Sequence, residues 1–252
     1  MRNKQTVFLL SLLLVLSFLV SPAFGQTNRE KAAEASRTAA KWLLSPSSST
    51  LQAQNAIQAV YLVKNQKTGK QATGFLLKNG PLITNETLVR GCSGPDILAL
   101  SCTAEEITFR PEIKTDPERN LAALFPTVRI SAPGLFISND PHFIAGNALS
   151  TWGYPAGYNN PPPVLCMGVF SGFQAYPKKD RLNEYVKHLL FSGNFDSGNC
   201  GGPLFEFYGD RVIGVIIPQT TAVGSKVLTG EAISLDDLRG FLKENNIPET
   251  TF

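Results

Sequence analysis

Short runs of apolar residues, separated by turn-forming residues, dominate the chain between residues 55 and 245. The runs Ala59 to Val63 and Gly74 to Lys78 have the composition of strands, and Asn79–Gly80 and Tyr208–Gly209–Asp210 interrupt the pattern as tight turns. Many short apolar segments with frequent turns are typical of barrels of antiparallel strands. The pattern therefore predicts that most of the chain is all-β.

Two helices are predicted, one before the strand-rich region and one at its C-terminal end. Thr27 and Glu30 form a capping-box pattern, and residues 26–54 are interpreted as a helix followed by a linker. The apolar face of this helix would consist of Ala32, Ala35, Ala39 and Leu43. Ser234 and Asp237 begin a final helix, whose apolar face would consist of Leu235, Leu238, Phe241 and Leu242. We expect the first helix to dock on the body of the protein, with binding to a partner as the alternative.

The N-terminus has the pattern of an export signal. Arg2 and Lys4 precede an apolar run from Val7 to Val20, and small residues follow at Ala23 and Gly25. We predict a signal peptide over residues 1–25, and hence a secreted or periplasmic protein. The alternative is an uncleaved anchor, but the run is shorter than the roughly 20 residues that a membrane-spanning helix needs.

Composition and charge fit one globular unit. The chain has 252 residues, 43% of them hydrophobic, which is enough to bury a sizeable core. Removal of residues 1–25 takes away two cations and no acid, which lowers the formal net charge from +3 to +1. A nearly neutral protein offers no electrostatic reason to bind nucleic acid or an anionic membrane.

The segment most informative about chemistry is the glycine-rich turn 197–204, which presents Cys200 where acyl-transfer enzymes place a nucleophile. It resembles the nucleophile loop of the trypsin-like serine peptidases, with Cys200 in place of the serine. In that family the backbone N–H groups of the nucleophile and of the glycine two residues before it form the oxyanion hole. These residues are Cys200 and Gly198 here, and we expect this hole to be intact.

The resemblance covers residues 55–245 and is to the Deg, or high-temperature-requirement, branch of the family. Segments 74–77 and 80–89 are similar to the strand, turn and strand that deliver the general-base histidine, and Thr87 stands at the position of that histidine. Segment 116–124 resembles the one that carries the orienting aspartate, and Asn120 stands in its place. Further similar segments are 152–157, 168–172 and 212–216.

The resemblance implies a specific architecture. We expect two antiparallel six-stranded β-barrels with short N- and C-terminal helices, a boundary between the barrels near residues 135–145, and a tail over 246–252. The peptidase-like domain would span residues 55–245. We expect none of the PDZ modules that many Deg relatives carry.

All three positions of the resembled catalytic triad are altered. The Thr87 hydroxyl is not a proton acceptor near neutral pH, so it cannot deprotonate a nucleophile. Asn120 can accept a hydrogen bond through its amide oxygen but carries no charge. Cys200 is the mildest change, because a thiol with a pKa of about 8.5 supplies roughly a few per cent of thiolate without help.

Other residues are weak substitutes for the missing base. The two histidines, His142 and His188, lie outside the segments that the family uses for catalysis. Glu86 is adjacent to Thr87, and neighbouring side chains normally point in different directions. Cys200 is interpreted first as a small residue that fills the turn.

The predicted peptide-binding strand follows segment 212–216. Its residues are Ile216, Ile217, Pro218 and Gln219, beside which a bound peptide would pair as an added strand. Pro218 removes one backbone donor from that edge.

If the chain is exported, its cysteines reach an oxidising compartment, where disulfides are expected. Cys92 and Cys102 flank a short turn-rich segment and are predicted to pair, although spacing alone does not determine connectivity. Cys166 has Cys200 as a possible mate, and that bridge would abolish the nucleophile. No Cys/His spacing resembles a zinc site, so we expect no metal, and no cofactor is indicated.

Together these features predict a secreted or periplasmic trypsin-like peptidase homologue that is catalytically inactive and binds a peptide or protein ligand in the cleft between the barrels. Two alternatives remain open. One is an active endopeptidase that uses Cys200 with a non-standard base, and the other is a structural or decoy protein of an envelope assembly. No nucleic acid partner is expected, and no membrane insertion after removal of the signal.

Overall fold

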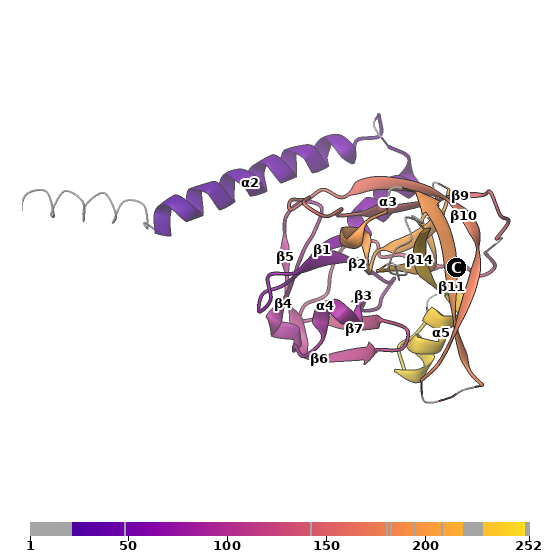
Figure 1. Ribbon diagram of the computed structural model, residues 1–252. Helices are drawn as coiled ribbons and strands as arrows, with labels where there is room; N and C mark the ends of the chain where they lie inside the picture. Colours follow the sequence, from indigo (N-terminus) through magenta and orange to yellow (C-terminus); the bar gives the residue numbers. More distant parts are fainter. Residues whose placement is uncertain are drawn as a thin grey trace, which may run out of the picture.

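The computed structural model describes residues 22–47, 49–141, 143–179, 181, 183–193, 195–207, 209–218 and 229–249. Within these residues the chain forms two β-barrels, and one long helix, α2, reaches outward from them (Figure 1). The prediction of an all-β fold with two barrels is confirmed. None of the described helices combines the length and the apolar character that crossing a membrane requires.

The first barrel is a seven-stranded sheet in the order β5-β4-β1-β2-β3-β7-β6. Its strands are β1 (Val60–Asn65), β2 (Gln71–Leu76), β3 (Leu82–Asn85), β4 (Ile97–Leu100), β5 (Glu106–Ile107), β6 (Phe109–Asp116) and β7 (Leu121–Pro126). The two-residue β5 is an addition to the six strands predicted. The sheet nearly closes where β6 passes the short 3-10 helix η1 (Gly94–Asp96), and the approach is so close that a Cβ on Gly94 would lie 1.7 Å from the Arg110 carbonyl oxygen.

The second barrel closes completely. Strand β12 pairs with both β9 and β13, which joins β9-β10-β11-β14-β13-β12 into a six-stranded cylinder, while β8 pairs with β13 in parallel outside it. Its strands are β8 (Phe136–Ile137), β9 (Ala148–Gly153), β10 (Val164–Pro177), β11 (Tyr185–Gly193), β12 (Pro203–Glu206), β13 (Arg211–Ile217) and β14 (Thr229–Ser234).

Three apolar clusters hold the fold together. One fills the first barrel around Tyr61 and Val63, and one fills the second around Leu189 and Phe191. The third runs between the barrels and reaches α3 and α5, and it includes Leu62. Alternate residues of β1 thus enter different clusters. Because both faces of β1 are buried, its first four residues form a continuous apolar run without alternation.

The N-terminal helix differs from its prediction. Helix α2 (Pro22–Leu43) begins before Thr27, so the pattern of Thr27 and Glu30 does not start a helix. The buried residues are Ser36 and Ala40, whereas Ala32 and Ala35 of the predicted face are exposed. Alanine and serine side chains bury little area, so their pattern specifies a face only weakly. The region predicted as a linker contains a second helix, α3 (Leu51–Ala59), capped by the Thr50 hydroxyl.

The C-terminal helix confirms its prediction. Helix α5 (Leu235–Glu244) begins after Ser234, whose hydroxyl accepts a hydrogen bond from the Asp237 backbone N–H at 3.3 Å. Its four predicted apolar residues are all buried: Leu235, Leu238, Phe241 and Leu242. The helix covers the second barrel and closes the cluster between the barrels (Figure 1).

Candidate active site

The loop that carries Cys200 lies at the junction of the two barrels, because hydrogen bonds tie it to a strand of each. From β2, the Thr73 backbone N–H donates to the Cys200 carbonyl at 3.1 Å, and the Thr73 hydroxyl donates to the Gly198 carbonyl at 2.8 Å. From the other side, the Gly201 N–H donates to the Ile216 carbonyl of β13 at 2.7 Å. These bonds bring the predicted nucleophile into the cleft between the barrels.

The two backbone N–H groups expected to form an oxyanion hole are both used inside the loop. The Gly198 N–H donates to Asp196 Oδ1 at 2.8 Å, and the Cys200 N–H donates to the Ser197 carbonyl at 3.4 Å, closing a turn of 3-10 helix, η2 (Ser197–Asn199). The expectation of an intact hole formed by Gly198 and Cys200 is therefore corrected. The physical reason is that each donor already has a partner: the Asp196 side chain caps η2 through the Gly198 N–H, and the turn of η2 engages the Cys200 N–H.

Asp196 also connects the loop to the turn that follows β9. Both of its carboxylate oxygens lie 2.9 Å from the Ala156 backbone nitrogen, so one side chain holds the N–H groups of Ala156 and Gly198 together. Sequence reasoning missed Asp196. The signal was an aspartate immediately before a short glycine-containing turn, a position where its side chain can cap the turn.

Thr87 and Asn120, at the positions of the resembled base and orienting acid, are brought into contact. The Thr87 backbone N–H and hydroxyl both donate to Asn120 Oδ1, at 2.9 and 2.7 Å. Thr87 is the second residue of the short helix α4 (Glu86–Val89). The side chain of Glu86 is instead paired at 2.7 Å with Arg90, the residue that follows α4.

Four of the predicted site residues share one cavity of about 340 Å³, which Asn120, Ile216 and Ile217 do not line. Thr87, Gly198, Cys200 and Pro218 all line it, which places the base position, the nucleophile position and the end of the cleft strand around a common space. The remaining lining residues are Lys70, Gln71, Ala72, Asn85, Leu88, Ala156, Gly157 and Ser197. We call this space the cleft cavity.

Cys200 is poorly suited to ionise. Its side chain is buried, with 5% of the residue exposed, and its sulfur lies 3.9 Å from the Asp196 carbonyl oxygen. Burial raises the pKa of the Cys200 thiol to about 12, and the negative charge of Asp196 adds to the effect. The thiolate fraction near neutral pH is therefore much smaller than for an ordinary cysteine.

His188 is engaged elsewhere. On β11, its Nδ1 lies 2.9 Å from Glu231 Oε2 of β14, and its ring packs on Tyr176 with the ring centroids 4.5 Å apart. It does not line the cleft cavity. His142 lies outside the described residues.

The predicted peptide-binding strand is only partly accessible. Ile216 and Ile217 are buried at 2% and 6% exposure, whereas Pro218 is exposed. The Ile216 N–H donates to the Gly202 carbonyl at 2.9 Å, and its carbonyl is occupied by Gly201, so neither backbone group is left for a peptide. Gln219 lies outside the described residues.

All four cysteines are free thiols, so the predicted Cys92–Cys102 disulfide is not formed, and neither is a bridge from Cys166 to Cys200. Cys92 instead contacts Asn65, whose Nδ2 lies 3.2 Å from its sulfur. Cys166 contacts Asn199 Nδ2 at 3.5 Å. Cys92 and Cys166 thus lie against asparagine side chains instead of another thiol, which sequence spacing does not reveal.

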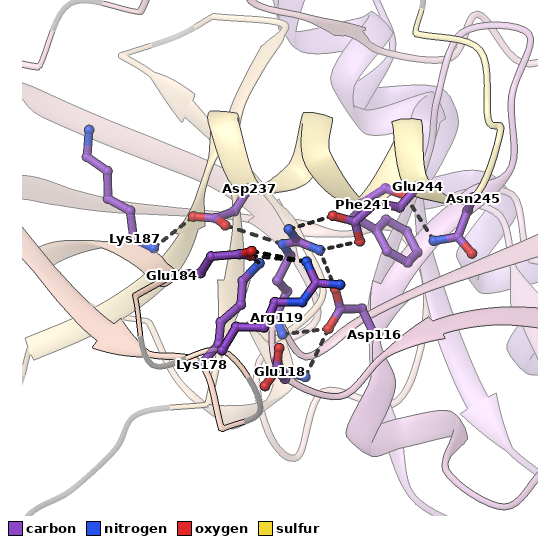
Figure 2. Close-up of polar contacts among 11 residues, drawn as sticks. Asp116, Glu118, Arg119, Lys178, Glu184, Lys187, Asp237, Phe241, Glu244 and Asn245 are labelled. Carbon is purple, nitrogen blue, oxygen red and sulfur yellow. Dashed lines mark hydrogen bonds and ion pairs between the residues drawn. The ribbon is translucent and has the colours of Figure 1, made fainter.

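A buried arginine beside Asn120 connects the two barrels to α5 (Figure 2). Arg119 is 6% exposed and pairs with Asp116 at 2.6 Å, with Glu244 at 2.8 Å and with Asp237 at 3.3 Å. Asp237 Oδ2 in turn accepts the Lys187 backbone N–H of β11 at 2.7 Å. Burial alone would lower the pKa of Arg119, but the carboxylates raise it above its usual range. Sequence reasoning missed this cluster because two of its carboxylates, Asp237 and Glu244, are distant from Arg119 in the chain.

The described residues contain no group of three or more His, Cys, Asp and Glu side chains placed to hold a metal ion. The polar side chains of the cleft cavity include no such set either.

The chain is similar to known proteins in sequence. The model of the trypsin-like peptidase domain family matches residues 72–215. A protein of Sinorhizobium fredii (strain NBRC 101917 / NGR234) named y4bJ is 28% identical over 161 residues, which cover 63% of this chain and 24% of that protein. The chain therefore spans about a quarter of the length of this curated relative.

Solved structures share the fold. The active form of the Rv3671c protease from M. tuberculosis has a TM-score of 0.61 at 18% identity, with 78% of this chain and 85% of that one covered. The HtrA-type protease AlgW with a tripeptide has a TM-score of 0.61 at 20% identity, with 75% and 60% covered. These structures confirm the fold expected from the sequence resemblance.

Proposed function

This chain belongs to the trypsin-like peptidase family, and we propose that it is a non-catalytic member that binds a peptide or protein segment in the cleft between its barrels. One observation carries the proposal. The residue at the base position, Thr87, directs its hydroxyl to Asn120 Oδ1 at 2.7 Å. That hydrogen is donated to an amide oxygen, so the position holds a neutral donor and no proton acceptor for a thiol.

Two further features support the absence of catalysis. The Cys200 thiol has a pKa raised to about 12, so it needs a base more than an ordinary cysteine does. The Gly198 and Cys200 N–H groups are occupied by Asp196 and Ser197, so the loop lacks donors aimed at a developing oxyanion. Amide hydrolysis would require both features to change together.

The cleft cavity supports a binding role. Its volume of about 340 Å³ is within the roughly 300–1,000 Å³ range of ligand sites, and it is lined mainly by apolar or small residues. Gln71 and Ser197 add polar groups to its wall. A peptide side chain of moderate size fits such a space, and the exposed Pro218 marks the end from which the ligand would enter.

Export is part of the proposal and is supported by the sequence of residues 1–25, with a basic start, an apolar run and small residues before Gln26. Mass spectrometry of the protein recovered from the host's extracytoplasmic fraction tests it, with a mature N-terminus at Gln26 as the expected result.

Catalysis is tested by incubating the mature protein with a mixed peptide library and analysing the products by mass spectrometry. We expect no cleavage by the native chain beyond that seen with Cys200→Ala. Cleavage that depends on Cys200 would overturn the non-catalytic assignment and favour the alternative of a cysteine endopeptidase.

Binding is tested with Ala156→Trp, which places a large ring in the cleft cavity, and with Ala175→Trp as the matched control. Ala175 is exposed on β10 and does not line the cavity. Peptides selected from a library on the native protein should lose affinity for Ala156→Trp and keep it for Ala175→Trp. Equal binding to all three proteins would contradict use of the cleft and favour a structural role.

A further inference from the structure

A second and larger hollow lies away from the cleft cavity. It has a volume of about 910 Å³. It is formed by residues 76–81 at the end of β2 and the turn to β3, residues 125–133 at the end of β7 and beyond it, residues 245–248 after α5, and Arg110 of β6. None of its lining residues lines the cleft cavity. We call it the cationic groove, because its charged lining residues are Lys78, Arg110 and Arg129, and no aspartate or glutamate lines it.

Arg110 and Arg129 differ from most arginines of the chain. Both are exposed, and among the described residues neither forms an ion pair with a carboxylate. The arginines that do pair with a carboxylate are Arg29, Arg37, Arg90, Arg119, Arg181 and Arg239. A guanidinium group presents a planar set of donors that matches a carboxylate, so two unpaired ones on one groove constitute a recognition feature for anions.

The neutral part of the groove is suited to a polypeptide. Phe125 and Ile130, both partly exposed, contribute apolar surface. Asn79 and Asn246 contribute exposed amides at two turns, where both residues have left-handed backbone conformations with φ of 55° and 56°. Side-chain amides both donate and accept hydrogen bonds, as an extended peptide backbone requires.

We propose that the cationic groove binds an extended acidic peptide segment of a partner protein. The carboxylates of the segment pair with Arg110 and Arg129, its apolar side chains pack on the wall formed by Phe125 and Ile130, and its backbone bonds to the amides of Asn79 and Asn246. The charge complementarity selects an acidic ligand, and the apolar wall distinguishes a peptide from a simple anion. This binding is independent of the cleft cavity and of whether Cys200 acts.

The test uses a fluorescein-labelled octapeptide in which glutamate alternates with valine, and the same peptide with glutamine in place of glutamate. Fluorescence anisotropy with the mature protein should give an affinity about tenfold or more higher for the glutamate peptide at low salt, with the difference shrinking as salt is raised. Equal affinity for the two peptides would overturn the proposal.

Site specificity is tested with the double variant Arg110→Glu and Arg129→Glu, which should weaken binding of the glutamate peptide by at least about tenfold, because attraction is replaced by repulsion. The matched control is Lys31→Glu with Lys41→Glu, which makes the same charge change on the exposed face of α2. An equal loss in the control would reduce the effect to overall charge and overturn the proposal. Thermal melts of both variants check that the fold is retained.

Two further experiments test other occupants of the cationic groove. A single-stranded oligonucleotide that displaces the peptide at a lower concentration than unlabelled peptide would overturn the proposal in favour of nucleic acid. A tenfold gain in peptide affinity on deletion of residues 250–252 would likewise overturn it, because the groove would then be occupied by the chain's own tail. The proposal expects neither result.

Discussion

Thr87 donates two hydrogen bonds to a single atom, Asn120 Oδ1, one from its backbone N–H at 2.9 Å and one from its hydroxyl at 2.7 Å. The pair occupies the positions where the resembled peptidases have a histidine and an aspartate. The contact between the two positions is thus present, while the proton-accepting group is absent. Since the Asn120 backbone has a left-handed conformation with φ of 50°, the side-chain contact also stabilises a strained turn.

Substitution at Asn120 should separate the side-chain contribution from the backbone strain. Asn120→Gly loses both hydrogen bonds but tolerates a positive φ, and we expect it to reduce the free energy of unfolding by about 1–2 kcal/mol. Asn120→Ala should be less stable than Asn120→Gly by about 1 kcal/mol more, because alanine resists this conformation. Urea denaturation of both variants measures the order. Equal stability of the two would show that the strain at this turn is negligible.

Thr87→Val provides the companion measurement. It removes the hydroxyl bond and keeps the backbone bond to Asn120 Oδ1, so we expect a loss of about 0.5–1.5 kcal/mol. A loss as large as that of Asn120→Gly would show that the hydroxyl bond accounts for the whole contribution and the backbone bond for none of it.

The reactivity of Cys200 towards alkylating reagents should be low. With a pKa raised to about 12 by burial and by Asp196, only about one thiol in ten thousand is ionised at pH 8. Iodoacetamide should therefore label Cys92, which is partly exposed, well before Cys200. Peptide mapping over a time course measures the two rates. If Cys200 were labelled at pH 8 as fast as Cys92 or faster, its burial and its raised pKa would be contradicted.

Removal of the Asp196 side chain should loosen the nucleophile loop. Asp196→Ala frees the N–H groups of Gly198 and Ala156, so their amide hydrogens should exchange faster with solvent. The alkylation rate of Cys200 should rise only a few-fold, since burial is the larger cause of the raised pKa and the charge of Asp196 the smaller. Asp140→Ala is the matched control, because Asp140 is exposed and lies outside the loop. Unchanged exchange at Gly198 in Asp196→Ala would refute the cap.

Arg119 should be among the more sensitive positions of the fold. Arg119→Ala leaves the carboxylates of Asp116 and Asp237 largely buried without their cation, and we expect a loss of about 3–5 kcal/mol in the free energy of unfolding. Arg119→Lys keeps the charge but not the planar set of donors, so its loss should be smaller. Guanidinium denaturation measures both losses. A loss below that of an average surface substitution would contradict a buried, fully engaged arginine.

The Arg119 cluster also predicts how the stability of the fold changes at acid pH. Arg119 lowers the pKa of Glu244 below its ordinary value of 4.5. A depressed folded-state pKa stabilises the fold at pH values above the unfolded-state pKa, and that stabilisation is lost as the pH falls through the folded-state value. Asp96 acts in the same direction, with its pKa lowered to about 2 by Lys67 and Ser93. The native chain should therefore lose stability progressively below about pH 4.5, and the Glu244 part of this loss should be absent in Arg119→Ala. Urea midpoints between pH 7 and pH 3 measure both slopes.

Residue identity and local pattern were sufficient for the family, for the two-barrel fold, and for the helix that begins after Ser234. The order of motifs along the chain also brought together residues far apart in sequence: Thr87 and Cys200 line one cavity, and Thr87 contacts Asn120. That Thr87 cannot serve as a general base follows from residue type alone, since a threonine hydroxyl is not a proton acceptor at neutral pH.

Only the tertiary structure decided where the backbone donors of the loop point and how strongly Cys200 is buried. The direction of the Gly198 N–H depends on the backbone angles of the loop and on a cap from Asp196, and the same carboxylate is held by Ala156 from another turn. The face of α2, the four free thiols and the Arg119 cluster likewise depend on residues far apart in sequence. The physical reason is that the direction of a hydrogen bond and the desolvation of a group depend on all the residues around it in three dimensions. A local sequence pattern specifies only the residues nearby in the chain.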